Sequence, residues 1–258
     1  MAKSYINITS TDFEVLALCR EVPFIDVDIV HKLFYGSQQL PDYARKKLTL
    51  LEKDSLLRGW MIAGQKKLYT LTKQGGAFLK MVSDEIEGKI FKPDFSQEYL
   101  FTSNIFAPNI SHTRRLIDLF LQLRAYSFFD KVAIFDHLSG KKEYTDNRPD
   151  ILICHGTHTI YLEYENSAKT PRSYIDRFNN FFKDSPRLIL VLYVCSDDWL
   201  AERILRYISE FRSSNNAQKF SEHGIKESER LYIGTRGMLF KNCLDKTLTF
   251  EQIIERLK

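Results

Sequence analysis

Hydrophobic positions recur every three or four residues in four stretches of the first eighty residues, and this spacing predicts four helices. The first stretch follows Thr11 and the second follows Asp26 or Asp28, which are residue types that cap helix N-termini. The third starts at Pro41, which the first turn of a helix tolerates, and the fourth follows Thr72, another capping residue. The apolar residues on these helices are Phe13, Val15, Leu16, Leu18 and Cys19; Ile29, Val30, Leu33 and Phe34; Ala44, Leu48 and Leu51; and Phe78, Leu79 and Val82.

Between the third and fourth predicted helices the pattern changes to two strand-like runs, residues 56–62 and 67–71. Residues 63–66 separate the runs and contain a glycine and a terminal lysine, so the two runs predict a β-hairpin. The order of three helices, a hairpin and a closing helix resembles a winged helix-turn-helix domain. We therefore expect residues 1–82 to form such a domain.

A different order of elements begins after residues 83–110, a mixed polar stretch that we interpret as a connector. An amphipathic helix capped by Ser111, three strands, a helix and one long apolar strand follow each other, which predicts an α-β-β-β-α-β core. The predicted strands are residues 132–135, 151–154, 159–165 and 188–195, with an exposed turn at His155-Gly156-Thr157-His158 and the middle helix around residues 174–182. A helix at 198–211, a polar loop at 213–229, a strand at 231–234 and a helix from Thr249 complete this second domain, residues 111–258. The predicted fold class is α/β, or α+β over the whole chain.

Positive charge is concentrated in the first domain. Residues 41–80 hold nine Lys or Arg against three Asp or Glu, a local charge of +6, while the whole chain carries +4, so the remainder is about −2. A basic module on a nearly neutral body indicates a polyanionic partner. No apolar run reaches the roughly eighteen residues of a membrane span, and four cysteines lack paired spacing, so we expect a cytoplasmic protein with no membrane partner.

The third predicted helix and the hairpin tip carry the residues that suit DNA contact. Polar and basic side chains off the apolar face of a helix can reach phosphates and base edges in the major groove, and lysines on a wing can follow the backbone. The expected DNA-binding residues are Tyr43, Arg45, Lys46, Lys47 and Thr49 on the helix, with Lys66 and Lys67 on the wing. A solvated basic face, or a winged helix that binds protein, remains an alternative.

Three acidic residues are expected to converge in the second domain. If residues 155–158 form the apex of an antiparallel hairpin, the numbers of facing residues sum to 313, so Asp150 faces Glu163 and Arg148 faces Glu165. Glu163 and Glu165 share a face because side chains alternate along a strand. Carboxylates this close need a positive partner, which Arg148, Lys169 or a divalent cation would supply.

These residues carry a resemblance to the PD-(D/E)xK nucleases. Pro149-Asp150 before a hairpin and Glu163-Tyr164-Glu165 after it lie inside an α-β-β-β-α-β order, as in that family. The resemblance implies that Asp150 and Glu163 hold Mg²⁺ or Mn²⁺. Glu165 stands at the family's lysine position, and Lys169 lies four residues further on.

The combination with a winged helix is similar to the MobC group of plasmid mobilisation relaxases and the related replication-relaxation proteins, over roughly residues 10–195. This resemblance implies a catalytic set of Asp150, Glu163, Glu165 and Lys169, with the three carboxylates as metal ligands. It also implies metal-dependent nicking of one strand of duplex DNA at an origin of transfer, in the cytoplasm of a bacterium. Single-stranded DNA after nicking and accessory mobilisation or coupling proteins would be further partners.

Three other residues are weaker candidates for the site. Tyr174 is the candidate nucleophile, although its helical spacing with Phe178 also fits a core position, and Tyr164 alternates to the face opposite the carboxylates. His112 and Arg148 are candidate supporting residues around the carboxylates.

Two alternatives to a nickase are open. The first alternative is a non-catalytic DNA-binding regulator or plasmid replication factor with an inactive nuclease-like domain. The second is a restriction enzyme that cuts both strands. The missing Glu-x-Lys spacing favours the regulator, while the presence of Asp150, Glu163 and Lys169 favours the nickase.

Overall fold

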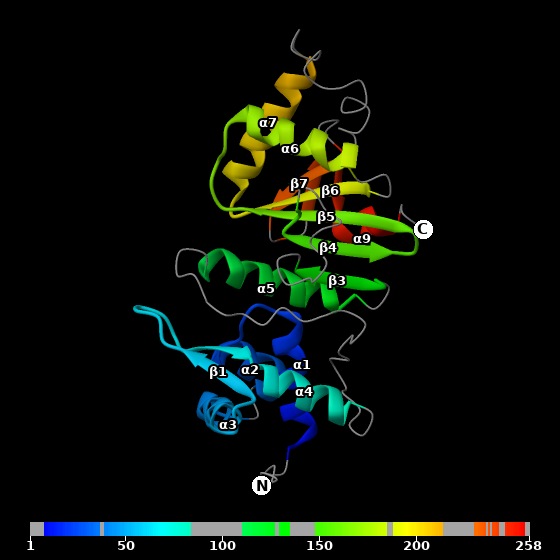
Figure 1. Ribbon diagram of the computed structural model, residues 1–258. Helices are drawn as coiled ribbons and strands as arrows, with labels where there is room; N and C mark the ends of the chain where they lie inside the picture. The colour runs from blue at the N-terminus through cyan, green and yellow to red at the C-terminus, as the bar shows by residue number, and fades with distance from the viewer. Residues whose placement is uncertain are drawn as a thin grey trace. The chain divides into compact units, whose positions relative to one another are not determined.

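The computed structural model divides the chain into two compact units and confirms a mixed α/β fold (Figure 1). The N-terminal unit comprises residues 1–113 and 137–139, and the C-terminal unit comprises residues 114–136 and 140–258. The structure describes residues 8–36, 39–83, 110–126, 129–134, 148–184, 188–213, 230–235, 237, 239–242 and 246–255. The predicted connector therefore lies outside the described residues except at its two ends, as do Phe135 and nearly all of the predicted loop at 213–229.

The N-terminal unit contains the predicted helices and hairpin in the predicted order. Its elements are α1 (Ser10–Glu21), α2 (Val27–Val30), the π-helix η1 (His31–Tyr35), α3 (Pro41–Lys53), β1 (Leu57–Trp60), β2 (Leu68–Leu71) and α4 (Lys73–Val82). The strands β1 and β2 pair antiparallel, with Leu57 opposite Leu71. The apolar faces of α1, α3 and α4 and the inner side of this hairpin supply the buried core of the unit.

Side-chain caps fix where these helices begin. Thr72 caps α4 and Asp26 caps α2 as predicted, each accepting a hydrogen bond from a backbone N–H of the first turn. The cap of α1 is Thr9, not Thr11 as predicted. Thr9 has the advantage because Asp12 accepts from its backbone N–H while Thr9 accepts from that of Asp12, a reciprocal capping box.

The C-terminal unit is built on a seven-stranded mixed sheet in the order β3-β4-β5-β6-β7-β8-β9. The strands are β3 (Lys131–Ile134), β4 (Ile151–His155), β5 (His158–Glu165), β6 (Leu188–Cys195), β7 (Leu231–Thr235), β8 (Leu239–Asn242) and β9 (Thr247–Thr249). The helices are α5 (Ile110–Arg124), which belongs to this unit from residue 114 onwards, α6 (Pro171–Asp184), α7 (Asp198–Ser213) and α9 (Phe250–Glu255). The pairs β5–β6 and β6–β7 are parallel and all others are antiparallel.

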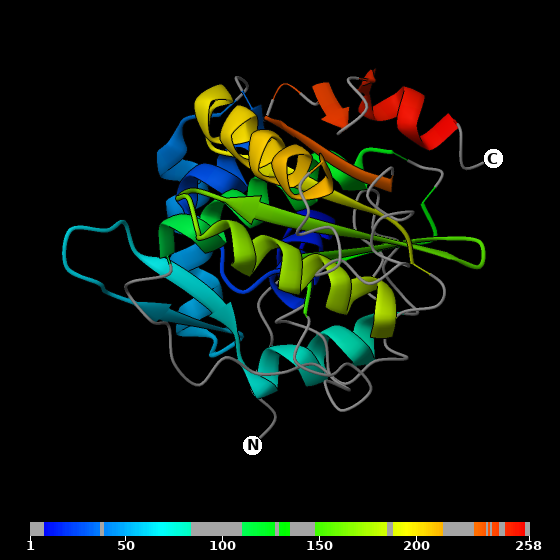
Figure 2. The same ribbon diagram turned by 90° about the horizontal axis from the view of Figure 1, so that it is seen from above.

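The parallel pairs follow from the two long helices between the central strands. Parallel neighbours need a crossover connection, and α6 links β5 to β6 while α7 follows β6 before β7. Figures 1 and 2 show α6 and α7 side by side on the same face of the sheet. Tyr174, Phe178 and Phe181 of α6 are buried at helical spacing, so this helix is held firmly over the sheet.

Two details of the C-terminal unit differ from the sequence prediction. Ser111 does not cap α5, because the helix already begins at Ile110. Strand β8 and the edge strand β9 were not predicted; they are four and three residues long, and too few of their positions are buried to give a readable alternation. Within the described residues, no helix is long and apolar enough to cross a membrane.

Candidate functional site

The β4–β5 hairpin has the predicted register. Ile151 pairs with Leu162 and His155 with His158, around a two-residue turn in which Gly156 adopts a φ of +57°. This turn needs a positive φ that a residue without a side chain adopts at least cost. Asp150 lies directly before β4, so the hairpin brings it to the part of β5 that carries the two glutamates.

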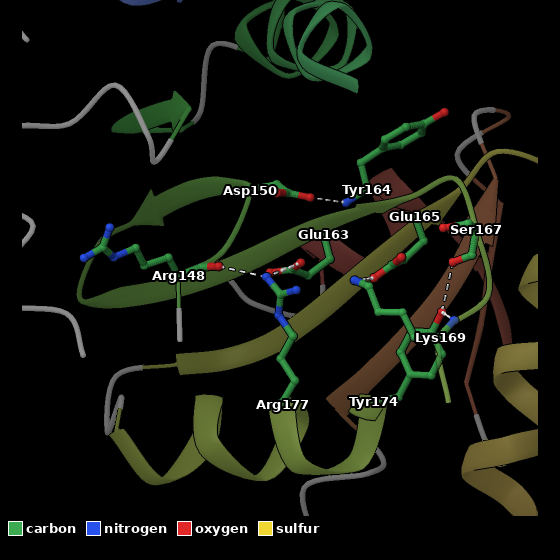
Figure 3. Close-up of polar contacts among 9 residues, drawn as sticks. All are labelled: Arg148, Asp150, Glu163, Tyr164, Glu165, Ser167, Lys169, Tyr174 and Arg177. Carbon is green, nitrogen blue, oxygen red and sulfur yellow. Dashed lines mark hydrogen bonds and ion pairs between the residues drawn. The ribbon is translucent and has the colours of Figure 1, made fainter. Parts of the chain in front are cut away.

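Glu163 and Glu165 are buried in the middle of the sheet, with 1% and 3% of their surfaces exposed. They lie beside Tyr193 and Cys195 of the parallel neighbour β6. Figure 3 shows the Tyr164 side chain pointing away from both glutamates, as the alternation predicts. Two acidic side chains on one buried face are unusual, because burial of a charge without compensation is costly.

Asp150 completes the acidic cluster through the backbone of β5. Its Oδ2 accepts a hydrogen bond of 2.7 Å from the backbone N–H of Tyr164, the residue between the two glutamates (Figure 3). The charge of Asp150 raises the pKa of both Glu163 and Glu165. The three predicted carboxylates therefore influence one another electrostatically.

Two cations lie against the buried glutamates. Arg177 of α6 has its Nη2 2.7 Å from Glu163 Oε2, and the same nitrogen donates a 3.0 Å hydrogen bond to the backbone carbonyl of Arg148. Lys169 Nζ forms an ion pair with Glu165 Oε1. Arg148 was expected to face Glu165 with its side chain, and this expectation needs correction: its side chain is exposed, and the residue contributes its carbonyl oxygen to the site.

Glu163 is the most strongly perturbed acid of the cluster. Burial raises its pKa well above 4.5, Asp150 raises it further, and Arg177 only partly opposes these effects. Its Oε1 is buried and has no hydrogen-bond partner among the described residues. Burial also raises the pKa of Glu165, against the opposing effect of Lys169. The fold thus holds both glutamates in a position where their charged forms are less stable than in water.

Tyr174 has a structural position beside this cluster. Its ring is buried and meets Tyr193 edge-on, and its hydroxyl accepts a 3.0 Å hydrogen bond from the backbone N–H of Lys169. Burial raises the pKa of its phenol to about 12. Tyr174 therefore holds the loop that carries Lys169, and these contacts favour its core interpretation over a role as nucleophile.

The chemistry of the carboxylates suits a hard divalent cation, which prefers oxygen ligands. The unpartnered Oε1 of Glu163 is the kind of buried acceptor that such an ion would satisfy. Among the described residues, however, no three His, Cys, Asp or Glu side chains are grouped as a metal site would require. Asp150, Glu163 and Glu165 thus fit Mg²⁺ or Mn²⁺ by donor type, while Arg177 and Lys169 neutralise the two glutamates in this structure.

Arg177 was not among the predicted site residues, although its position in the sequence carries a signal. Tyr174, Arg177, Phe178 and Phe181 follow each other at helical spacing, and the other three are apolar core residues. A charged residue on the buried face of a helix indicates a buried partner of opposite charge. Tyr193, whose buried hydroxyl has no partner among the described residues, was also missed, because it lies in a continuous apolar run.

The seven predicted DNA-binding residues divide by their contacts. Tyr43, Arg45, Lys46 and Thr49 of α3 are exposed, and so is Lys66 at the hairpin tip. Lys47 reaches Asp12 of α1 at 3.0 Å with only 20% of its side chain exposed, and Lys67 reaches Glu52 of α3 at 2.6 Å. These two lysines join elements of the fold to each other, so the exposed five are the better candidates for phosphate contact.

The histidines contribute little to the picture. His112 is half-buried on α5 and stays a prediction, while His155 packs edge-on against Phe129 and His158 is exposed in the hairpin.

Comparisons of the chain with family models, with curated proteins and with solved structures give no match.

Proposed function

We propose that this protein is a metal-dependent DNA endonuclease that nicks one strand, and that its N-terminal unit is a winged helix-turn-helix that binds the duplex. The observation that carries the proposal is Glu163, a buried acid beside Asp150 and Glu165, whose Oε1 has no hydrogen-bond partner in the described part of the chain and whose pKa is strongly raised. Acids with strongly shifted pKa values are concentrated at functional sites, because burial and neighbouring charges there adjust the pKa to the chemistry. An origin of transfer is the DNA target that fits the resemblance to mobilisation relaxases.

The topology around the cluster supports a nuclease-like core. The meander β3–β4–β5, the helix α6 and the strand β6 parallel to β5 follow the α-β-β-β-α-β order expected after α5. Asp150 lies at the start of the second strand of this core, and Glu163 and Glu165 end the third. This is the arrangement that the PD-(D/E)xK resemblance implies.

The side chains of the site would have different roles in such a reaction. Asp150, Glu163 and Glu165 would hold Mg²⁺ or Mn²⁺, which supplies Lewis-acid polarisation of a phosphate and lowers the pKa of bound water. Lys169 keeps its ammonium beside Glu165 with 40% of its side chain exposed, so it offsets the acidic charge where a phosphodiester would approach. The backbone N–H of Tyr164 orients Asp150.

A plasmid assay tests the proposal. Supercoiled plasmid that carries the protein's own origin region should give open circles with Mn²⁺ and none with EDTA, and linear product would indicate cleavage of both strands. The E163Q variant should not nick, while E202Q, a matched change at an exposed position of α7, should nick like the wild type. Millimolar Mn²⁺ should raise the melting temperature of the wild type but not that of E163Q.

A non-catalytic DNA-binding regulator is the second candidate. Arg177 and Lys169 already pair with Glu163 and Glu165, so the fold compensates part of its buried charge without an ion. Plasmid that is bound but stays supercoiled with Mn²⁺, together with a melting temperature indifferent to Mn²⁺, would favour this function.

A further inference from the structure

Arg177 has the properties of an anion-binding residue that is only partly engaged. Its Nη2 makes both polar contacts, with Glu163 and with the carbonyl of Arg148. A guanidinium has five N–H donors on three nitrogens. Within the described part of the chain, both of these contacts use Nη2, and Nε and Nη1 take part in neither. Its side chain is 31% exposed, so part of it is accessible to solvent.

The position of this guanidinium is fixed by its surroundings. Arg177 lies on the buried face of α6, and its guanidinium carbon is 5.5 Å from the ring centre of Phe181. Figure 3 shows the side chain extending from α6 to a point between Glu163 and the Arg148 backbone. A planar fork that is already held by two acceptors and a ring loses little conformational freedom when it binds a third group.

The charge around Arg177 explains why an anion could approach an acidic cluster. Asp150, Glu163 and Glu165 would repel a phosphate, whereas Arg177 and Lys169 bring positive charge into contact with Glu163 and Glu165. Of the two, Lys169 is a compact ammonium already engaged by Glu165, whereas Arg177 presents a fork that matches two oxygens of one phosphate.

We propose that Arg177 is the phosphate-binding residue of this site: Nη2 keeps Glu163 in place while Nε and Nη1 bind a phosphodiester of the DNA. The inference rests on the proposed function and names the group that holds the substrate beside the carboxylates. It assigns to α6, and not only to the N-terminal unit, a direct part in binding the DNA backbone.

Salt dependence of DNA binding by the full-length protein tests this assignment in EDTA, where cleavage plays no part. Each phosphate contact contributes about 0.9 to the slope of log affinity against log salt. R177M should lower that slope by about this amount and weaken binding to a short labelled duplex several-fold. R172M, the same change at an exposed position of α6 that pairs with Asp176, should leave both unchanged.

A second variant decides the matter if R177M folds poorly. R177K keeps the charge and loses the fork, so it should keep most of the slope but bind the duplex less tightly than the wild type. An R177M slope equal to that of the wild type, or R177K affinity equal to that of the wild type, would overturn the assignment. These measurements need no metal, so they separate the two proposals. If the wild type does not nick but R177M lowers the salt slope as expected, only the nickase proposal is refuted. If the wild type nicks but the slope of R177M is unchanged, only the role of Arg177 is refuted.

Discussion

The two candidate binding regions, the exposed basic surface of the N-terminal unit and the carboxylate cluster of the C-terminal unit, use the same kinds of ion pair in opposite environments. In the N-terminal unit, Arg45 pairs with Asp42 and Lys66 pairs with Asp28, and all four side chains are more than half exposed. In the C-terminal unit, the acidic partners Glu163 and Glu165 are almost completely buried. Water screens the first kind of pair and is excluded from the second, so the same chemistry has different energetic consequences.

This difference indicates what each region is suited to bind. An exposed lysine or arginine exchanges a neighbouring carboxylate for a DNA phosphate at little cost, because both states are solvated. A buried carboxylate needs its cation, or another cation in its place, because no water is available to solvate its charge. The N-terminal surface therefore suits an exchangeable polyanion, and the buried cluster suits fixed cationic partners.

The largest effect should come from breaking a buried pair. R177M removes the guanidinium from Glu163 and leaves the carboxylate buried without its main counter-ion, which should cost about 2–3 kcal/mol of unfolding free energy. R172M on the same helix breaks an exposed pair and should cost less than about 0.5 kcal/mol. Urea unfolding of both variants measures the difference, and equal losses would refute the contrast between the two environments.

The next effect concerns the pH dependence of stability. Since burial and Asp150 raise the pKa of Glu163, the folded protein keeps a proton that the unfolded chain releases above pH 4.5. The contribution of Glu163 is therefore fully present below that pH and falls as the pH rises, by up to about 1.4 kcal/mol per pH unit for one proton.

E163Q cannot lose this proton, so its unfolding free energy should decline less steeply than that of the wild type from about pH 5 upwards. Denaturation curves at several pH values measure the slope, with the exposed E202Q as control. Parallel curves for E163Q and the wild type would contradict the raised pKa of Glu163.

A smaller effect separates two adjacent lysines of α3. Lys47 neutralises Asp12, whose side chain is 5% exposed, so K47A should cost about 1 kcal/mol of stability. Lys46 is exposed, so K46A should leave stability unchanged but lower the salt slope of DNA binding by about 0.9. Thermal unfolding and a salt titration of both variants test this, and the reverse pattern would exchange their roles.

The smallest effect should come from the exposed pairs. R45A and K66A should each change the unfolding free energy by less than about 0.5 kcal/mol, because their partners Asp42 and Asp28 stay solvated. Both should still weaken duplex binding if the N-terminal unit contacts DNA. Destabilisation well above this value, with unchanged DNA affinity, would make these pairs structural.

Local patterns predicted much of the fold, and the places where they failed have physical causes. The apolar strand at 188–195 and the hairpin register were predicted correctly, because a strand buried on both sides and a tight glycine turn leave few alternatives. Thr9, and not Thr11, caps α1 because Thr9 and Asp12 form reciprocal hydrogen bonds, each accepting from the backbone N–H of the other. Strands β8 and β9 pair antiparallel with their neighbours along the chain, β7 with β8 and β8 with β9, but they are too short to show an alternation of buried and exposed residues in the sequence.

The sequence by itself determined the order of elements, the basic N-terminal unit and the face shared by Glu163 and Glu165, because spacing along one strand or helix sets these features. Only the tertiary structure decided which cations meet the carboxylates. It replaced the expected Arg148 side chain with Arg177, a residue twelve positions after Glu165 on a helix that crosses over the sheet. The spacing of Arg177 with the core residues of α6 indicates a buried partner, but it does not say which carboxylate, since packing of α6 against the sheet fixes that contact.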